Sequence, residues 1–370
     1  MGKHQKHAKL KLRDNDNFAP NELAIVGTNC TNISNLVSKV SKKLLNYKLA
    51  YFDASHRNSV EENVIDTFTF HHKGTAEVSI KSEVNKFNQR IQFSQYDFVF
   101  INGNHYQGAK QILILDNNKE ASVLKRLDQL NNIQFVVKLN DDSEYFNFLI
   151  DHNPQIKNLK CYHINEVDEI SKHIENLIKE KIAPINGLVL AGGKSTRMGT
   201  DKGTLNFYGK NQRDFAMELL EKNNLKSFLS VREDQEITVE NKIVDKFIGL
   251  GPFGAICSAF QENPDVAWLV IATDLPFVTN EIIQLLLKHR NPSKIATTIK
   301  GKDKQFPEPL ITIWEPKSYT ILLNYLAQGY SCPRKVLINS DVEIVEVEDH
   351  FIRNINTPEE FKKAQKEINE

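Results

Sequence analysis

Two patterns of hydrophobic and polar positions alternate along the chain. Short runs rich in β-branched and aromatic residues predict strands, and longer segments with apolar residues three or four positions apart predict helices. Segment 167–180 shows the second pattern, because its apolar residues fall on one helical face: Val167, Ile170, Ile174, Leu177 and Ile178. This alternation predicts an α/β fold, with parallel sheets and helices on both faces.

The first half of the chain contains seven strand candidates, at 22–27, 48–53, 66–70, 76–80, 96–103, 111–116 and 133–138. Helical segments at 33–45 and 121–130 fit between them. Pro184 ends the helix at 167–180 and a new apolar run follows at once, so we expect a domain boundary near 181–185. The expected parts are a basic flexible tail at 1–19, an α/β domain at 20–183 and a second α/β domain at 184–370.

The second half begins with the strand candidate 185–191, which runs into a charged, glycine-rich loop. Further strand candidates are 227–231, 266–272, 294–299, 309–314 and 342–347. Helices are expected from about Arg213, near 255–261, from about Asn280 and from Thr357, where Pro358 and two acids suit a first helical turn. The order predicts a doubly wound, Rossmann-like domain with its site at the carboxyl ends of the strands.

Composition narrows the classes of partner. The 370 residues suit two domains, and Lys plus Arg equals Asp plus Glu at 47 each, so the basic excess of a nucleic-acid-binding protein is absent. The sequence has no apolar run of the roughly 20 residues that span a bilayer. The start resembles no signal peptide, so we expect a cytoplasmic protein without a membrane partner.

Two further features of the sequence are its basic start and its four cysteines. The basic start, from Lys3 to Arg13, predicts a solvated tail, and the alternative is an arm that folds over an anionic ligand. The four cysteines have neither CxxC nor zinc-ligand spacing, which indicates scattered buried thiols in a reduced compartment: Cys30, Cys161, Cys257 and Cys332.

The stretch LAGGKSTRMGTDKGTL, 190–205, combines glycines with cations directly after an apolar strand. Glycines allow backbone N–H groups to turn toward an anion, and Arg197 and Lys202 add full charges suited to a polyphosphate. A Walker A loop is excluded, because Leu188 stands where the pattern GxxxxGK[ST] needs its first glycine. The alternative is a tight solvated turn, but the density of the pattern favours a nucleotide-phosphate loop.

This stretch resembles the LAGGxSxRMGxDKxxL signature of nucleotidyltransferases, most closely the molybdenum cofactor guanylyltransferases, and the resemblance extends over about 186–368. It implies that the loop binds nucleotide through Leu190, Ala191, Gly192, Gly193, Ser195, Met198 and Gly199, with Arg197 and Lys202 as catalytic cations.

Further segments follow in the order of that family. In VDKFIGLGPFGAI, Gly251 and Pro252 make a nucleotide-binding turn, and Asp245 matches the carboxylate that reads the donor edge of guanine. In WLVIATDLPFV, Asp274 ends a buried strand, where the family's aspartate is catalytic and holds Mg²⁺. The alternatives are a solvated acid for Asp245 and a helix N-cap for Asp274.

The remaining segments concern the acceptor. EPLITIW resembles the strand that lines the family's acceptor pocket, although Thr312 and Trp314 depart from its commoner residues. Asn354 and Asn356 belong to the NxNTPE element and are expected near the metal and phosphates. Arg334, in SCPRKVL, is a candidate for an anionic acceptor, and a plain helix start explains it equally well.

The resemblance implies transfer of GMP from GTP to the phosphate of molybdopterin, with Mg²⁺ as cofactor and pyrophosphate as leaving group. Molybdoenzymes or cofactor-insertion proteins are the implied further partners. The chemistry needs charge neutralisation and positioning rather than a strong base. Rival readings are a cytidylyltransferase for the same cofactor, a sugar-phosphate nucleotidyltransferase of the same fold, and a non-catalytic molybdopterin carrier.

The first half resembles the GTP-binding adaptor that partners the guanylyltransferase. In GTNCTNIS, 27–34, Gly27 and Ser34 fit a P-loop, but Asn32 replaces its second glycine and Ile33 its lysine. Asn102 stands where the adaptor family has Glu. We expect a P-loop-like domain that no longer hydrolyses GTP, and the alternative is a structural domain without a ligand. Asp53 with His56, and His71 with His72, are further candidate ligands, although solvated loop residues explain them more often.

Overall fold

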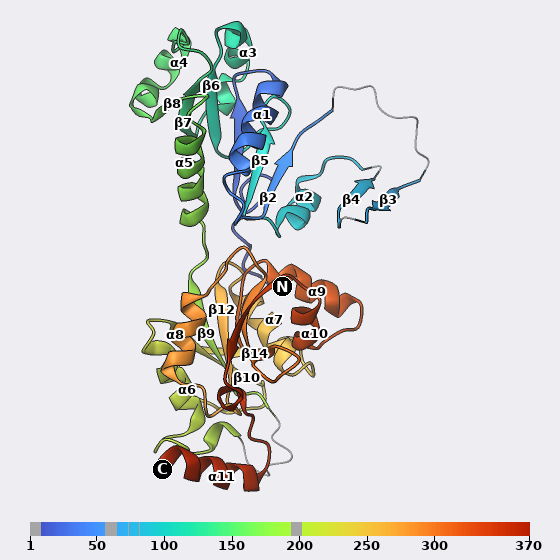
Figure 1. Cartoon of the computed structure of the whole chain (residues 1–370), viewed down its shortest axis with the longest axis vertical. Helices are drawn as coiled ribbons and strands as arrows, with labels where there is room; N and C mark the ends of the chain where they lie inside the picture. Colours follow the sequence, from blue (N-terminus) through green and yellow to red (C-terminus); the bar gives the residue numbers. More distant parts are fainter. Residues whose placement is uncertain (1–8, 56–64, 73, 81, 194–201) are drawn as a thin grey trace, which may run out of the picture. The chain divides into compact units, whose positions relative to one another are not determined.

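The computed structural model describes residues 9–55, 65–72, 74–80, 82–193 and 202–370. The chain divides into two compact units, one formed by residues 15–181 and the other by residues 182–370 together with 9–14 (Figure 1). Within the second unit, the backbone N–H of Asp14 donates to Asp265 Oδ1, and Lys11 donates to Asn263. Residues 9–14 are therefore held against folded elements of that unit.

The N-terminal unit is built on a six-stranded sheet in the order β2-β5-β1-β6-β7-β8, with all neighbours parallel. Its strands are β1 (Glu22–Val26), β2 (Leu49–Phe52), β5 (Phe98–Asn102), β6 (Gln111–Leu115), β7 (Ile133–Lys138) and β8 (Cys161–His163). The predicted strands β3 (Thr67–Phe70) and β4 (Ala76–Ser79) instead form a separate antiparallel hairpin. A short connection can join only antiparallel neighbours, which accounts for the difference.

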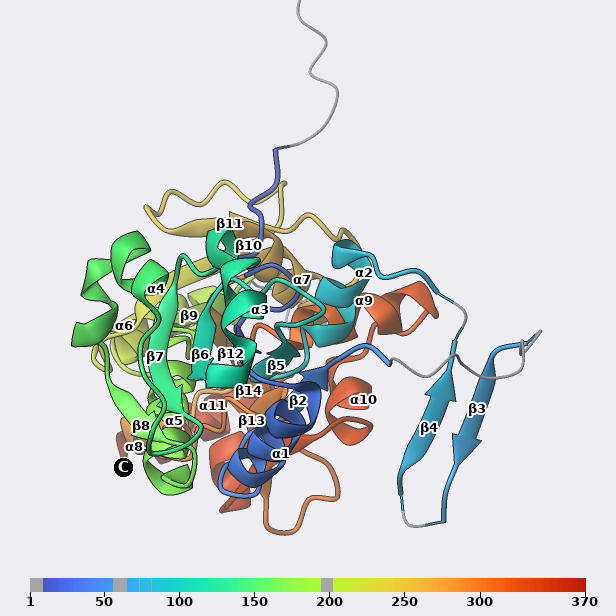
Figure 2. The same cartoon turned by 90° about the horizontal axis from the view of Figure 1, so that it is seen from above.

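Helices cover both faces of this sheet. Side chains alternate along β1, so that Leu23 and Ile25 pack against α1 (Cys30–Ser41) and α5 (Val167–Glu180), which lie side by side in Figure 2. The opposite face carries α2 (Lys86–Phe93), α3 (Glu120–Leu124) and α4 (Asn147–His152). Since both faces are covered, every residue of β1, β5 and β6 is buried.

The C-terminal unit is built on a seven-stranded mixed sheet in the order β11-β10-β9-β12-β14-β13-β15. Its strands are β9 (Ile185–Leu190), β10 (Lys226–Val231), β11 (Lys242–Val244), β12 (Ala267–Ala272), β13 (Ala296–Gly301), β14 (Glu308–Trp314) and β15 (Val342–Val347). One strand departs from the expected parallel arrangement, because β14 runs antiparallel to both β12 and β13. Only six residues connect β13 to β14, too few for a parallel crossover.

The helices of this unit also lie on both faces of its sheet (Figures 1 and 2). Helices α6 (Gln212–Glu221) and α8 (Asn280–Lys288) cover one face, and α7 (Pro252–Glu262), α9 (Ser318–Ala327) and α10 (Pro333–Ile338) cover the other. The strand order reverses at β9, so the loops after β9, β10 and β12 meet at one edge. This is the position in which doubly wound sheets bind ligands.

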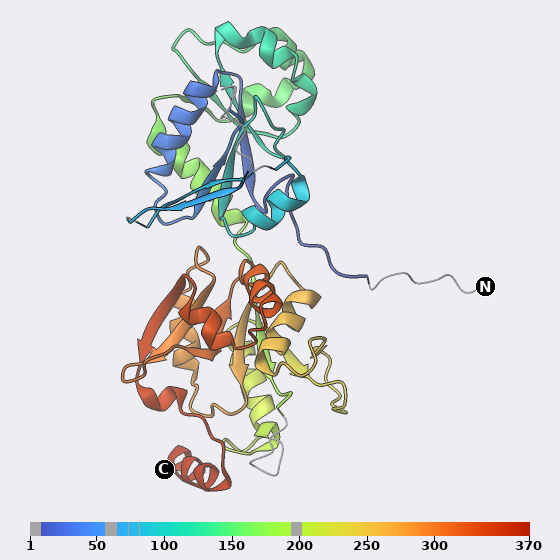
Figure 3. The same cartoon turned by 90° about the vertical axis from the view of Figure 1, so that its right-hand side faces the viewer.

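The last helix, α11 (Pro358–Asn369), closes the chain below these layers in Figure 3. It starts as predicted, with Thr357 as N-cap in a capping box and Pro358 in the first turn. Phe361 packs edge-on against Phe207, and Gln365 donates to the carbonyl of Asn206. The segment before the helix is thereby fixed beside the loop that follows β9.

Candidate functional site

The glycine-rich loop leaves the sheet at its centre. Strand β9 is paired on both sides, by β10 and β12, and ends at Leu190. An added Cβ at Gly192 would lie 3.3 Å from Asp245 Oδ2, so glycine allows the loop to pass close to this carboxylate. The predicted loop residues Ser195, Arg197, Met198 and Gly199 lie outside the described residues.

Two side chains after β10 brace this loop. Arg232 Nη1 donates to the carbonyl oxygens of Gly192 at 2.7 Å and Gly193 at 3.2 Å, and Gln235 Nε2 donates to that of Ala191 at 3.1 Å. The backbone carbonyls of the loop are thus held by protein donors. Sequence reasoning missed both residues, because nothing in VREDQ signals a contact with a segment about 40 positions away.

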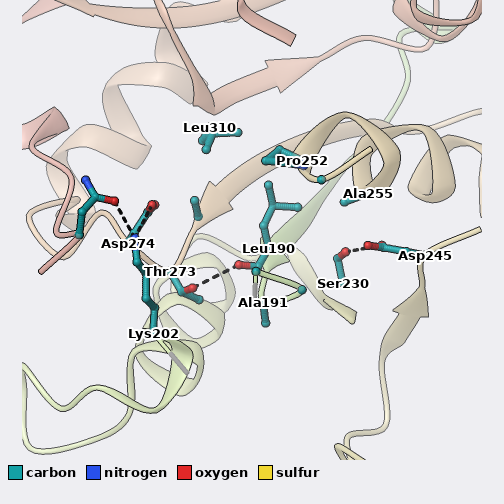
Figure 4. Close-up of a pocket in the computed structure, with 15 residues that line it drawn as sticks. Leu190, Ala191, Lys202, Ser230, Asp245, Pro252, Ala255, Thr273, Asp274 and Leu310 are labelled. Atoms are coloured by element: carbon teal, nitrogen blue, oxygen red, sulfur yellow. Dashed lines mark hydrogen bonds and ion pairs between the residues drawn. The ribbon is translucent and has the colours of Figure 1, made fainter. Parts of the chain in front are cut away.

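The loop, the ends of β10 and β12 and the start of α7 surround a cavity of about 370 Å³ (Figure 4). Its lining consists of Leu190, Ala191, Gly192, Gly193, Lys202, Ser230, Asp245, Gly251, Pro252, Ala255, Ala272, Thr273, Asp274, Leu310 and Asn356. The structure therefore brings together predicted residues of four separate motifs. It adds Ser230, Ala255, Ala272, Thr273 and Leu310, which the sequence interpretation did not name as site residues.

One end of the cavity carries a carboxylate. Asp245 follows β11, and its Oδ1 accepts a hydrogen bond from Ser230 Oγ at 2.8 Å. Burial raises the pKa of Asp245, while the hydrogen bond from Ser230 and the charge of Arg232 act in the opposite direction. A half-buried carboxylate of this kind can accept two N–H groups from the edge of a base.

The other end combines a cation, a carboxylate and an amide. Lys202 Nζ lies 2.8 Å from Asn356 Oδ1 and 3.3 Å from Asp274 Oδ2. Asp274 comes two residues after β12, and its carbonyl accepts from the N–H of Ile355 at 2.9 Å, which places Asn354 and Asn356 beside it. Asp274 is therefore not acting as the helix N-cap, since α8 starts at Asn280 after Thr279.

The oxygen atoms at this end fit a hard divalent cation. Among the described residues, Asp274 Oδ1 and Asn354 Oδ1 are buried without a hydrogen-bond donor. Carboxylate and amide oxygens are ligands that Mg²⁺ accepts, and Mg²⁺ commonly takes only one or two carboxylates besides water and substrate phosphates. In the described part of the chain, no three His, Cys, Asp or Glu side chains form a cluster that could hold a metal ion.

A second cavity, of about 600 Å³, is lined by Lys304, Gln305, Phe306, Glu308, Arg334, Asp349, His350, Ile352, Arg353 and Asn354. Its lining carries both cations and acids, and Lys304, Arg334 and Arg353 are each ion-paired with a carboxylate. Arg334 donates to Glu308 Oε2 at 3.3 Å, and burial raises the pKa of Glu308 although Arg334 opposes this shift. The predicted residues Arg334 and Asn354 thus lie here, whereas Asn356 lies in the first cavity.

The strand β14 contributes less to a pocket than its motif suggests. Leu310 reaches the first cavity and Glu308 the second. Thr312 and Trp314 are fully buried, and Thr312 is hydrogen-bonded to Thr298 inside the core. Neither Thr312 nor Trp314 lines the first or the second cavity.

In the N-terminal unit, the segment 27–34, which resembles a P-loop in sequence, forms the start of helix α1. Helix α1 begins three residues after Gly27, and the side chain of its N-cap Asn29 accepts from the N–H of Asn32. Ile33, aligned with the P-loop lysine, is fully buried in the core. A cation at this position would therefore face the core rather than a phosphate.

Comparisons with known proteins agree with the geometry of the C-terminal unit. Residues 187–343 match the family model of the MobA-like NTP transferase domain, so the C-terminal half contains a domain of this nucleotidyltransferase family. The "Molybdenum cofactor biosynthesis bifunctional protein" of Synechocystis sp. is 34% identical over 183 residues, covering 48% of this chain and 53% of that protein. The chain thus spans about half the length of this relative.

Two further similarities are weaker. A "Probable molybdenum cofactor guanylyltransferase" of Flavobacterium johnsoniae is 23% identical over 177 residues, covering 47% of this chain and 92% of that protein. The crystal structure of molybdopterin-guanine biosynthesis protein B superposes on 43% of this chain and 99% of its own, with a TM-score of 0.31 and 17% identity. The resemblance of the second half to the guanylyltransferases is confirmed at the level of the domain family. In the described helices, no segment is both long and apolar enough for a membrane span.

Proposed function

We propose that the C-terminal unit transfers GMP from GTP to the terminal phosphate of molybdopterin and releases pyrophosphate. The observation that carries this proposal is the polarity of the first cavity, with Asp245 at one end and Lys202, Asp274 and Asn356 at the other. A nucleotide has the same polarity, since a base with N–H donors lies at one end and an anionic triphosphate at the other.

We assign guanine as the base from the pattern of its hydrogen-bond donors. The N1–H and N2 amino groups of guanine both donate, so the Asp245 carboxylate can accept from both. Ser230 holds one oxygen of this carboxylate, and the turn at Gly251 and Pro252 borders the same space. Cytosine presents only its N4 amino donor along with acceptors, so a carboxylate selects it less well.

The triphosphate is assigned to the opposite end. Lys202 Nζ supplies a cation, and Arg197 adds a second one by its place in the motif. A Mg²⁺ ion held by Asp274 and Asn354, when bound, would neutralise negative charge on the phosphates. Lys202 then stabilises charge on the leaving pyrophosphate, and the loop N–H groups orient the chain of phosphates.

The acceptor is assigned to the second cavity. Molybdopterin carries a phosphate and a pterin ring, and the cavity is lined by Lys304, Arg334 and Arg353 together with the aromatic ring of Phe306. Each of these cations is paired with a carboxylate, which an acceptor phosphate would have to displace or share. Segment 354–356 lies between the two cavities, with Asn354 in one and Asn356 in the other. The acceptor phosphate can therefore approach the α-phosphate without a strong general base, because it is already anionic near neutral pH.

For the N-terminal unit, we propose an adaptor-like role in acceptor binding or assembly without hydrolysis of GTP. The self-capped start of α1 and the buried Ile33 support the absence of hydrolysis. Molybdoenzymes and cofactor-insertion proteins are the partners that this role would serve.

The experiment that tests the proposed reaction measures pyrophosphate release with Mg²⁺ and molybdopterin, comparing GTP, CTP, ATP and UTP at equal concentrations. Release that requires both GTP and molybdopterin supports the proposal. A preference for CTP keeps the reaction type and refutes the role of Asp245. Tight molybdopterin binding without release from any nucleotide refutes the enzyme and favours a carrier.

A further inference from the structure

A cluster of chemically reactive side chains lies at the carboxyl edge of the N-terminal sheet. Cys30 follows β1, Asp53 follows β2 and His105 follows β5, and these strands are neighbours in the order β2-β5-β1. Loops at the carboxyl ends of neighbouring parallel strands converge, especially where the strand order reverses. Three residues from distant parts of the sequence therefore meet in one place.

The distances within the cluster bring a thiol and a carboxylate to the same nitrogen of an imidazole. Cys30 Sγ lies 3.4 Å from His105 Nε2, and the same nitrogen lies 3.7 Å from Asp53 Oδ1. Asn104 Nδ2 approaches Cys30 Sγ at 3.7 Å. Two nitrogen groups thus face the sulfur atom from the loop that follows β5.

The carboxylate of Asp53 is fixed in place. Its Oδ1 accepts from Asn102 Nδ2 at 2.8 Å and from the N–H of Ala54 at 2.7 Å, and its Oδ2 accepts from Tyr51 at 2.9 Å. Burial and the hydrogen bond to Asp53 raise the pKa of the Tyr51 hydroxyl, which therefore keeps its proton. Asp53 thus presents a fixed carboxylate 3.7 Å from His105 Nε2.

Besides His105, Asn104 and Asp53, the start of helix α1 also acts on the thiol of Cys30. It is the first residue of the 12-residue helix α1, where the backbone N–H groups favour a negative charge. Reactive cysteines in proteins are found at partly exposed helix starts beside histidine, whereas thiols buried in apolar surroundings are inert. Cys30 is partly exposed.

The other cysteines provide the contrast. Our expectation of four buried thiols is wrong for all but Cys257, because Cys30 is only partly buried and Cys161 and Cys332 are exposed. Burial raises the pKa of Cys257 to about 12. The described cluster does not meet the requirements of a metal site, and His56 lies outside the described residues.

We propose that Cys30 is a nucleophilic thiol and a site of modification by soft electrophiles, hydroperoxides in particular, with His105 as its proton partner. The thiolate sulfur attacks one peroxide oxygen, so an S–O bond forms while the O–O bond breaks. The sulfur loses two electrons and becomes a sulfenic acid, and the peroxide gains two. The leaving hydroxide takes the proton held at His105 Nε2 and departs as water. This assignment is independent of the nucleotidyl transfer proposed for the other unit.

The test is alkylation of the full-length protein with iodoacetamide at several pH values between 6 and 8, with the rate at each cysteine followed by mass spectrometry. We expect Cys30 at pH 7 to react about tenfold faster than Cys332, although Cys332 is the more exposed thiol. A rate at Cys30 equal to or below that at Cys332 would overturn the proposal. This comparison needs no variant, because both thiols belong to the same molecule.

Two variants separate proton transfer from mere accessibility. His105→Asn removes the proton partner and should slow alkylation at Cys30 and shift its pH profile toward that of Cys332, while the rate at Cys332 stays constant. Treatment with hydrogen peroxide and a sulfenic-acid trap should label Cys30, and the label should be lost in Cys30→Ser. An unchanged Cys30 rate and pH profile in His105→Asn, or no trapped product at Cys30, would contradict the proposal.

Discussion

Gly192 and Asp245 lie so close together that a single added methyl group at Gly192 would stand 3.3 Å from Asp245 Oδ2. Such a contact is tight, so the loop or the carboxylate must shift to relieve it. The positions of the glycine-rich loop and of the carboxylate that we propose to bind the base are thus coupled, although 53 positions separate Gly192 from Asp245 in the sequence.

Replacing this glycine should therefore weaken nucleotide binding. We expect Gly192→Ala to raise the KM for GTP several-fold, because the displaced carboxylate no longer meets the base. Gly193→Ala is the matched control, since among the described residues nothing lies within 4 Å of a Cβ at Gly193. Steady-state kinetics of both variants give the answer, and equal KM values for the two variants would refute the coupling.

The pH dependence of GTP binding should report the ionisation of Asp245. Only the ionised carboxylate accepts both N–H groups of guanine, and burial raises its pKa above the ordinary range of an aspartate. Lowering the pH therefore protonates Asp245 and raises the KM for GTP, with the effect beginning at a higher pH than for an exposed aspartate. Asp245→Asn should raise the KM about tenfold or more and abolish this acidic limb. A limb that persists in the variant would assign the titration to another group.

Asp274 distinguishes an enzyme from a carrier. Asp274→Asn leaves Lys202 and Asn356 in place but removes the charge that would hold Mg²⁺, so kcat should fall by about a hundredfold or more. Binding of molybdopterin, measured by fluorescence titration, should change little. Asp151→Asn, in the exposed part of α4, is the matched control and should behave as the unmodified protein. Retained turnover in Asp274→Asn would remove this residue from the mechanism.

Arg334 should affect the acceptor and not the nucleotide. It lines the second cavity and faces the buried carboxylate of Glu308. We expect Arg334→Ala to raise the KM for molybdopterin while the KM for GTP stays constant, and Arg334→Lys to restore part of the loss. A rise in the KM for GTP alone would contradict this prediction, because it would indicate that Arg334 contributes to the nucleotide subsite.

Arg290 should contribute to the free energy of unfolding of the C-terminal unit and not to the proposed reaction. Its guanidinium holds the buried carboxylate of Glu315 through two hydrogen bonds, at 2.7 and 2.8 Å, and a third reaches the carbonyl of Ala183. Arg290→Ala leaves a buried charge unpaired, which typically costs about 3–5 kcal/mol of the free energy of unfolding. Both tryptophans of the chain are buried in the C-terminal unit, so urea unfolding followed by tryptophan fluorescence reports this unit. A loss well below 1 kcal/mol would show that the ion pair contributes little.

Most helices and strands could be predicted because their side-chain periodicity is local. The helix at 167–180 appears with the expected bounds, and Thr357 caps the last helix as its neighbours suggest. Strand direction is different, since a hydrophobic run reads the same in both directions. The antiparallel β14 and the hairpin of β3 and β4 were therefore beyond pattern reasoning.

The candidate site likewise contains residues that the sequence predicts and residues that it does not. Lys202, Asp245 and Asp274 carry motif signals, and the structure places them around one cavity. Arg232 and Gln235 carry none, because their role arises only when β10 lies beside β9. The second cavity likewise combines residues near 304–308, 334 and 349–354, which only the folded sheet brings together.

The measurement that tests the central claim most directly follows the α-phosphate of GTP. The protein is incubated with Mg²⁺, molybdopterin and GTP labelled at either the α- or the γ-phosphate, and the products are separated. Nucleotidyl transfer predicts that the α-label appears in a molybdopterin dinucleotide and the γ-label in pyrophosphate, in equal amounts. Release of the γ-label as inorganic phosphate, with the α-label remaining in GDP, would contradict the account, because it would show hydrolysis instead of GMP transfer.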